Sequence, residues 1–201
     1  MKVNIIVFGK FHAFDLASHL SKKGILKNLI TSFPVFKVHE VDNKIPKSNI
    51  KSFFVLEIIS RILKKLNFSS DKIDGFIKLI FQKLSIRFID KDDINIIWAG
   101  NGAYILKNCQ TNINIIERHS IHIKEQNNLL KEEYKINAKN YAFSDSNIND
   151  QLYEYELSSY IMTPSKFVKD SFIKNLFDSN KIIVNPLGCD LSAFKCIKKT
   201  D

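Results

Sequence analysis

Residues 3–9 read VNIIVFG, and this stretch decides the fold class. Apolar and β-branched side chains dominate the run from Val3 to Phe8, without the strict alternation of apolar and polar residues that marks a half-buried strand. Such a run is typical of a strand that is buried on both faces, as in parallel sheets covered by helices. The run ends at Gly9. It therefore predicts a central strand of a covered sheet.

The residues that follow alternate between helical and strand patterns. Residues 13–23 predict a helix that ends at Gly24, because apolar residues recur at helical spacing and two lysines fill the last turn. A strand follows at residues 27–33 and is closed by Pro34. Further short apolar runs, separated by stretches of helical period, lie at residues 94–98, 113–116, 160–162 and 182–184. This alternation predicts a single Rossmann-like α/β domain, with a mostly parallel sheet and helices on both faces.

Length and composition agree with one globular domain. The chain has 201 residues, of which 45% are hydrophobic and 25% charged. This composition provides a core and excludes a disordered protein, a collagen and a disulfide-stabilised miniprotein. No run approaches the roughly 18 apolar residues that span a bilayer, and residues 5–8 are too short for a signal peptide. The sequence predicts a cytoplasmic protein and leaves peripheral attachment to the inner face of the membrane open.

The chain is basic and contains few cysteines. Thirty lysine and arginine residues against 21 acidic residues give a net charge of +9, which favours nucleic acid, anionic lipid headgroups or phosphorylated ligands as partners. Nucleic acid is disfavoured because no helix-turn-helix or RNP-like pattern is present. Cys109, Cys189 and Cys196 form no CxxC pair, which predicts free thiols in a reducing compartment.

Small and polar residues follow several of the predicted strands. Gly9, Gly100 and His119 stand at three such ends, and Ser165 stands at a fourth. Since the carboxyl ends of parallel strands line one edge of the sheet, where doubly wound proteins bind ligands, we expect these residues to line a crevice. Tight turns into helices would explain the small residues without a ligand, and the two explanations are compatible.

The densest polar group follows the strand at residues 113–116. It comprises Glu117, Arg118, His119, Ser120 and His122. A histidine or glutamate at a crevice edge can hydrogen-bond a hydroxyl or act as a base near neutral pH. Alternatively, Ser120 caps the next helix, Glu117 pairs with Arg118 and the histidines fill space; we favour function because five polar groups exceed what capping requires. Two histidines three apart, with no cysteine or carboxylate at ligand spacing, do not predict a metal site.

Residues 51–89 predict two amphipathic helices joined by the polar stretch 67–71, and they hold eight basic against three acidic residues. A basic amphipathic helix can lie on an anionic membrane. More commonly, a helix turns its apolar face to the sheet and its lysines to water. We expect these helices to cover the sheet and keep membrane binding as an alternative.

Another helix is predicted after residue 165. Ser165 is a natural N-cap, and Val168, Phe172 and Leu176, at spacing four, are expected to bury one face of this helix. The free N–H groups at such a helix start can also bind an anion, which keeps Ser165 among the candidate substrate contacts.

Several motifs of nucleotide-binding proteins and hydrolases are absent from the sequence. It contains no GxGxxG after the first strand, and no GxxxxGK[ST], GxSxG or HExxH motif anywhere. Dehydrogenases, P-loop kinases, serine hydrolases of the elbow type and zincin proteases are therefore not favoured.

Five segments, in order, resemble the N-terminal half of family 4 glycosyltransferases with the two-domain GT-B fold. They read GKFHAFDLASHL (9–20), LITSFP (29–34), ERHSIHIKEQNNLLKEEY (117–134), YEYELSSYIMTPSKFVKDSF (153–172) and IIVNPLGCDLSAF (182–194). The passage from SKFV to the last segment resembles the end of the first domain and its linker. The resemblance implies that residues 1–190 form the N-terminal Rossmann-like domain and that residues 191–201 begin the interdomain linker.

Family 4 enzymes are retaining and usually metal-independent, and they transfer a sugar from a nucleotide-sugar to a glycan or lipid-linked acceptor. The resemblance implies that this domain contacts the acceptor. It makes Glu117, His119 and His122 candidate catalytic residues, and it leaves open which histidine matters, because the family's histidine aligns with either one. Glu154 and Glu156 match a glutamate-containing helix of the family. The implied substrate contacts are Gly9, Lys10, Phe11 and His12, which match the family's first loop. Their places at strand ends add further expected substrate contacts, which are Gly100, Asn101, Arg118, Ser120 and Ser165.

One departure from the family pattern limits the expected activity. The family's second domain, which holds the nucleotide-sugar, has no counterpart before Asp201. The resemblance therefore implies no cofactor for this chain, a nucleotide-sugar donor only with the missing domain, and no transferase activity alone. A truncated copy, one product of a split gene with a companion chain, and a separately produced domain are the alternatives. A rival function is a noncatalytic, membrane-associated subunit of a heteromeric glycosyltransferase that uses residues 51–89.

Overall fold

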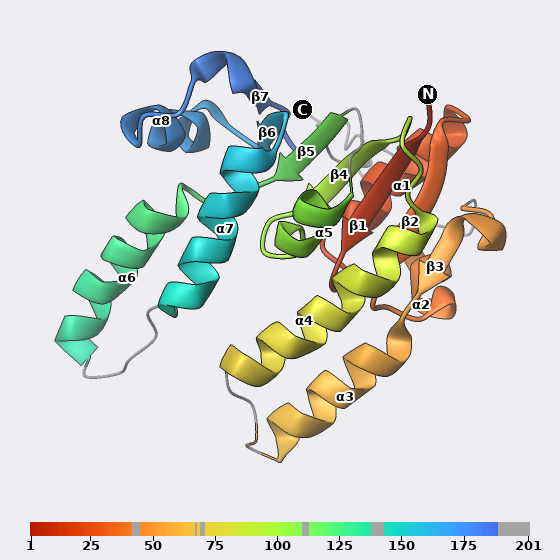
Figure 1. Cartoon of the computed structure of the whole chain (residues 1–201), viewed down its shortest axis with the longest axis horizontal. Coiled ribbons are helices and arrows are strands. Elements are labelled where there is room, and N and C mark those ends of the chain that lie inside the picture. Colours follow the sequence, from red (N-terminus) through yellow and green to blue (C-terminus); the bar gives the residue numbers. More distant parts are fainter. Residues whose placement is uncertain (42–44, 67, 69–70, 110–112, 138–142, 189–201) are drawn as a thin grey trace, which may run out of the picture.

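The centre of the molecule is a seven-stranded sheet in which all paired neighbours are parallel (Figure 1). The structure is a computed structural model that describes residues 1–41, 45–66, 68, 71–109, 113–137 and 143–188. The strand order is β3-β2-β1-β4-β5-β6-β7. The strands are β1 (Val3–Val7), β2 (Leu26–Thr31), β3 (Ile50–Ser52), β4 (Ile94–Trp98), β5 (Ile113–Glu117), β6 (Tyr160–Thr163) and β7 (Ile182–Val184).

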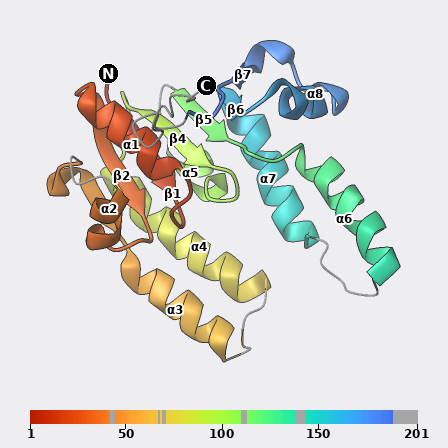
Figure 2. The same cartoon turned by 180° about the vertical axis from the view of Figure 1, so that it is seen from behind.

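Helices cover both faces of this sheet, as Figures 1 and 2 show from opposite sides. Residues of α1 and α2 pack in one hydrophobic cluster, and residues of α4, α5, α7 and α8 pack in the other. The expected Rossmann-like α/β architecture is confirmed. The helices are α1 (Ala13–Lys22), α2 (Val35–Val41), α3 (Phe54–Lys65), α4 (Asp71–Ser85), α5 (Ala103–Asn108), α6 (Ile123–Asn137), α7 (Asp145–Leu157) and α8 (Lys166–Lys174).

The opening apolar run forms the strand that the sequence predicts. All five residues of β1 are buried, and β1 pairs with β2 on one side and β4 on the other. Ile5 and Val7 belong to the cluster beneath α1, whereas Ile6 belongs to the opposite cluster. A strand with both faces covered needs apolar residues at consecutive positions, which explains the absence of alternation.

Four buried asparagines form a ladder across the sheet. Asn28 donates from Nδ2 to Asn4 Oδ1 at 3.0 Å, Asn4 donates to Asn95 Oδ1 at 3.0 Å, and Asn95 donates to Asn114 Oδ1 at 3.0 Å. The partners stand opposite each other in the strand register. Buried amides satisfy one another only in this register, so the ladder aligns β2, β1, β4 and β5.

Helices α3 and α4 lie side by side and extend away from the sheet (Figures 1 and 2). The second half of α4 packs on the core through Ile77 and Phe81. Among the residues of α3, all of which the structure describes, Ser60 alone is buried. The expectation that both helices turn their apolar faces to the sheet is therefore wrong for most of α3: Leu56 packs against the core, but Ile58 and Ile62 are exposed.

The helix after Ser165 is present, but one of its expected core residues is not in the core. Ser165 is the N-cap of α8 and accepts from the Val168 backbone N–H, as expected. Val168 and Phe172 are buried, whereas Leu176 follows the helix at φ +67° and is 95% exposed. Because α8 ends at Lys174, the helical spacing does not extend to Leu176, and Phe177 packs against Phe172 instead.

The expectations about free cysteines, the interdomain linker and membrane spans concern residues that the structure describes only in part. Cys109 is a free thiol, while Cys189, Cys196 and the predicted linker 191–201 lie outside the described residues. Within the described part of the chain, none of the helices combines the length and the apolar character needed to cross a membrane.

Candidate functional site

The strand order reverses direction between β1 and β4. From β1 the chain winds outward through β2 and β3, and then returns to the other side of β1 with β4. The helices that follow the two strands consequently lie on opposite faces, α1 in one cluster and α5 in the other. In open α/β sheets a ligand crevice forms at such a switch point, outside the carboxyl ends of the two strands.

The loop after β1 has an unusual backbone and an exposed aromatic ring. Gly9 has φ +116° and Phe11 has φ +42°. A side chain at position 9 would be strained, and its Cβ would lie 3.3 Å from the Phe11 ring. The Thr31 hydroxyl donates to the Gly9 carbonyl at 2.8 Å and ties the loop to β2. Phe11 is 60% exposed despite its apolar ring. A positive φ at a residue other than glycine, as at Phe11, is retained most often where function requires it.

Three ligand-type side chains meet at the switch point. His12, from the loop after β1, faces His119, from the loop after β5, with the two Nε2 atoms in direct contact. His119 Nε2 also lies 3.0 Å from Glu117 Oε1, at the end of β5. The Trp98 ring, at the end of β4, lies 5.6 Å from the His12 ring and 5.8 Å from the His119 ring. The expected convergence of the strand ends is thus present in the structure.

Burial decides the charge of this cluster. It raises the pKa of Glu117 to about 8 and lowers the pKa of His119 to about 4, the latter with help from the nearby His12 and Arg118. Burial also lowers the pKa of His12, although Asp15 opposes this shift. Glu117 and His119 are close enough for an ion pair, but both environments disfavour charge. At neutral pH the contact is therefore best described as a hydrogen bond from a protonated carboxyl to a neutral imidazole.

Four buried polar atoms at these strand ends have no hydrogen-bond partner among the described residues. They are Trp98 Nε1, Asn101 Oδ1, Glu117 Oε2 and His119 Nδ1. Glu117 is only 4% exposed. Because an unpaired buried polar group costs about 1–3 kcal/mol, such a group in a native fold calls for an explanation, and a ligand that supplies the partner is one.

The loop after β4 is held by a glutamate from α7. Glu154 accepts from the backbone N–H groups of Gly100 and Gly102, at 2.7 and 2.6 Å, and from that of Ala103 at 3.1 Å. Gly100 has φ +83°. Burial raises the pKa of Glu154 to about 7, while the three N–H donors and Lys78 lower it. Glu154 thus holds the loop after β4, which includes Asn101, in place beside the switch point. The sequence did not reveal this positioning role.

Two of the sequence candidates point away from the crevice. His122 is 1% exposed and lies among the rings of Tyr155, Phe172 and Phe177. This placement differs from the expectation that His122 faces the cleft; the two residues between it and His119 begin the turn into α6 and carry it into the core. Arg118 is also buried, and its guanidinium donates to Gln151 Oε1 at 2.7 Å and Gln126 Oε1 at 2.5 Å.

The remaining candidates lie at or near strand ends. Lys10 is exposed and Ser120 is half-buried. Asn101 is buried, and its Nδ2 donates to the Trp98 carbonyl at 3.1 Å. Ser165 follows β6 and is engaged as a helix cap. The structure therefore groups His12, Glu117 and His119 with the loops at Gly9 and Gly100, and it gives Arg118 and His122 places in the core.

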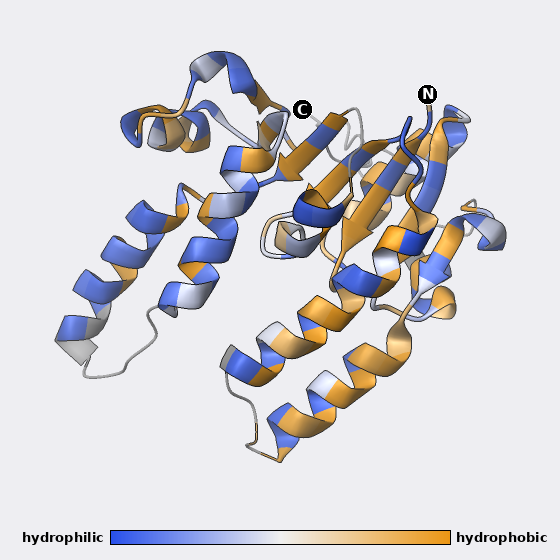
Figure 3. Cartoon of the chain, viewed as in Figure 1, coloured by the Kyte–Doolittle hydropathy of each residue, from blue (hydrophilic) through white to orange (hydrophobic). Residues whose placement is uncertain are grey.

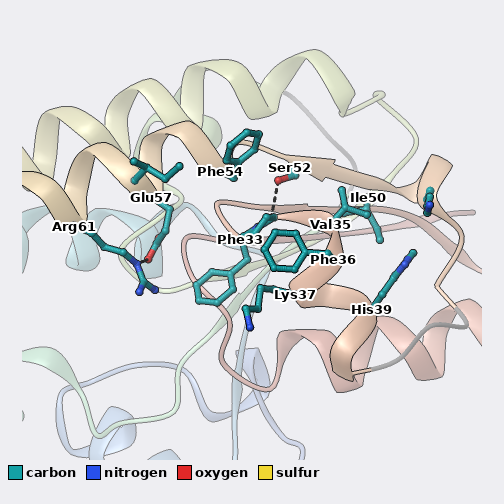
Figure 4. A pocket seen from close by; sticks show the side chains of 13 residues that line it. Phe33, Val35, Phe36, Lys37, His39, Ile50, Ser52, Phe54, Glu57 and Arg61 are labelled. Carbon is teal, nitrogen blue, oxygen red and sulfur yellow. Dashed lines mark hydrogen bonds and ion pairs between the residues drawn. The ribbon is translucent and has the colours of Figure 1, made fainter.

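A separate apolar groove opens beside β3, with a volume of about 1130 Å³. Figure 4 shows Phe33, Val35 and Phe36 on one side and Phe54 with α3 on the other. Basic side chains of Lys37 and Arg61 stand at its rim, each paired with a glutamate of its own helix. The sequence did not single out this groove, because its walls come from α2, β3 and α3 and no periodic pattern links them.

No protein-family model matches this chain, and neither a curated protein nor a solved structure shows significant similarity to it.

Proposed function

We propose that this chain is the acceptor-binding half of a retaining, GT-B-type glycosyltransferase. The observation that carries the proposal is the convergence of His12, Glu117 and His119 at the switch point, beside buried polar atoms that have no hydrogen-bond partner among the described residues. Neutral histidines and a protonated carboxyl can donate and accept hydrogen bonds with sugar hydroxyls without the cost of burying charge. The resemblance of five segments to family 4 enzymes supports the same assignment.

Within this function the chain orients a sugar acceptor, and another domain holds the nucleotide-sugar. Holding an acceptor hydroxyl in line with a donor converts a bimolecular step into an effectively unimolecular one, which is a large share of enzymatic rate enhancement. The donor-binding domain is to be supplied by a companion chain or by further sequence. Turnover of a nucleotide-sugar by this chain alone would contradict the proposal that another domain binds the donor.

Phe11 is the residue best placed to contact a sugar ring, because its exposed ring stands in the loop beside His12. Replacing it (Phe11→Ala) is expected to weaken glycan binding about tenfold, equivalent to about 1.4 kcal/mol. The measurement is saturation-transfer NMR of the purified chain with a panel of oligosaccharides and detergent-solubilised glycolipids.

The matched control is Leu129→Ala, since Leu129 on α6 is similarly exposed, at 53%, and belongs neither to the switch-point residues nor to the α3–α4 hairpin. It should bind glycans like the unchanged chain. UDP-glucose serves as a comparator and is expected to bind weakly or not at all. The proposal fails if no glycan or glycolipid of the panel binds, or if UDP-glucose binds more tightly than any of them.

A second candidate role, attachment to an anionic membrane, is favoured by the surface of α3. Figure 3 shows apolar residues along α3 and α4. The exposed apolar side chains of this hairpin are Phe54, Val55, Ile58, Ile59, Ile62, Leu66, Phe68 and Phe76. The exposed basic residues Lys64, Lys65 and Lys72 lie on the same hairpin. An apolar face bordered by lysines is the pattern of an interfacial helix, which also suits a lipid-linked acceptor.

The double change Ile58→Ser and Ile62→Ser is expected to weaken membrane binding at least about tenfold, because each buried isoleucine contributes roughly 1 kcal/mol or more. The measurement is flotation with vesicles of phosphatidylcholine, with and without about one-third phosphatidylglycerol. The unchanged chain should float only with the anionic vesicles, and less so as salt is raised.

Leu129→Ser is the control, since Leu129 on α6 is similarly exposed on another helix. This variant should float like the unchanged chain. Failure of the unchanged chain to float, or equal flotation of the double variant, would rule out α3 as a membrane anchor and leave the acceptor-binding proposal unaffected.

A further inference from the structure

We propose that His12, Glu117 and His119 form a binding site for a divalent transition-metal ion, with zinc as the best fit. Each of the three residues offers one ligand atom, and these atoms all lie within 4.8 Å of one another. His12 follows β1, and Glu117 and His119 lie at the end of β5 and just after it. His12 and His119 are 107 residues apart in the chain, and only the strand order brings them together. The inference does not depend on the proposed glycosyltransferase function, and it departs from the metal independence that the family resemblance implies.

The donor set fits zinc in kind and number. Two imidazole nitrogens with one carboxylate oxygen are a common catalytic zinc set, and imidazole ligands favour zinc and its transition-metal neighbours over magnesium or calcium. Ligands at about 2.0–2.1 Å from a tetrahedral zinc lie roughly 3.3 Å from one another. The 3.0 Å separation of His119 Nε2 and Glu117 Oε1 is close to this value. The two Nε2 atoms of His12 and His119 lie closer together than this, so zinc binding requires the two rings to move apart.

Hydrogen bonding alone does not satisfy this cluster. His119 Nε2 faces both His12 Nε2 and Glu117 Oε1, but an imidazole nitrogen offers either one proton or one lone pair and so serves one partner fully. Glu117 Oε2 remains without a partner among the described residues. A metal ion accepts one lone pair from each of the three side chains and resolves this competition.

Glu117 also lacks a counter-charge. In the described part of the chain, His119 is the one basic side chain within ion-pair distance of its carboxylate. The guanidinium of the neighbouring Arg118 is turned instead toward Gln151 and Gln126. A divalent ion would take the place of the carboxyl proton on binding, and it would supply the positive charge that the buried carboxylate then needs.

Three protein ligands leave at least one coordination position open. His12 and His119 are half-buried rather than enclosed. The site therefore has the character of a catalytic or substrate-binding metal centre, in which water or a ligand oxygen occupies the open position, and not that of a closed structural zinc site.

The test is isothermal titration of zinc chloride into the full chain, purified with a chelator and kept reduced. We expect one equivalent to bind tightly, and we expect His12→Ala, Glu117→Gln and His119→Ala each to weaken it at least about 100-fold, more than loss of an outer-shell partner does. His19→Ala, which removes an exposed histidine of α1, is the matched control and should bind as the unchanged chain. Glu117→Gln keeps the side-chain shape, so it carries the test if another variant does not fold.

Two further readouts complete the test. Zinc should raise the thermal midpoint of the unchanged chain but not that of Glu117→Gln, because a ligand that binds only the folded state stabilises it. X-ray absorption of the zinc-loaded chain should show nitrogen and oxygen ligands. Absence of zinc binding, binding that all three variants retain, or sulfur ligation by the cysteines would each overturn the proposal.

Discussion

Replacement of Asn95 by leucine is expected to lower the free energy of unfolding by about 3 kcal/mol. Asn95 stands in the middle of the ladder, where it accepts from Asn4 and donates to Asn114. Leucine has a similar shape but no polar atoms, so the change removes both the hydrogen bond from Asn4 and the one to Asn114. Removing one partner of a buried hydrogen bond costs about 1–3 kcal/mol, and the added apolar surface offsets only part of the loss of two such bonds.

Urea unfolding followed by circular dichroism measures the effect. The matched control is Asn128→Leu, because Asn128 is exposed on α6. This control should change the free energy of unfolding by less than about 0.5 kcal/mol. If Asn95→Leu were as stable as the unchanged chain, the ladder would not hold the strands in register as we describe.

The second large effect is a loss of stability as pH rises through the range in which Glu154 ionises. Its pKa in the folded chain is about 7, above the ordinary value of 4.5, with burial as the largest cause. Between these values the folded state binds a proton that the unfolded state has released. The contribution of Glu154 to stability is therefore fully present below about pH 4.5 and is lost as pH rises through about 7, by about 3 kcal/mol in all.

The measurement compares urea unfolding at pH 5 and pH 8 for the unchanged chain and for Glu154→Gln. Glutamine has no charge to bury and keeps an oxygen that can accept from the loop, so the variant should lose less stability between these pH values. The charged and titratable groups near Glu154 are Lys78, Arg118 and Tyr155, and all three are the same in both chains. The assignment is wrong if both chains show the same dependence on pH.

Glu154 also shows how stability and site geometry are linked in this fold. Its two oxygens hold three backbone N–H groups of the loop after β4. A Cβ on Gly102 would lie 3.1 Å from the Ile97 side chain, so the loop packs closely on the sheet as well. The loop after β4 is thus held by Glu154 of α7 and by its packing on β4.

The local patterns of the sequence predicted the elements well where burial was complete. The apolar run at β1 indicated a strand covered on both faces, and Ser165 indicated the start of α8. The same reasoning was wrong for α3, because amphipathic spacing shows that a helix has an apolar face but does not show whether another layer covers it. It was also wrong for Leu176, which continues the helical spacing beyond the end of the helix.

The candidate site was predicted in part. The sequence directed attention to Glu117, His119 and the loop at Gly9, since polar residues after buried strands share an edge of a parallel sheet. It weighed a metal site only for His119 with His122, the histidine nearest in the chain, whereas the structure pairs His119 with His12. Nothing in the spacing of residues could reveal that pairing, and nothing in it could show that His122 turns into an aromatic cluster.

The sequence by itself determined the alternation of strands and helices, because burial on one or both faces imposes a period that is written within a few neighbouring residues. Only the tertiary structure decided that β4 lies beside β1, that four asparagines meet across the sheet and that His12 reaches His119. These are contacts between residues far apart in the chain. They depend on the order in which strands pair, which is set by the packing of the whole domain and leaves no local period in the sequence.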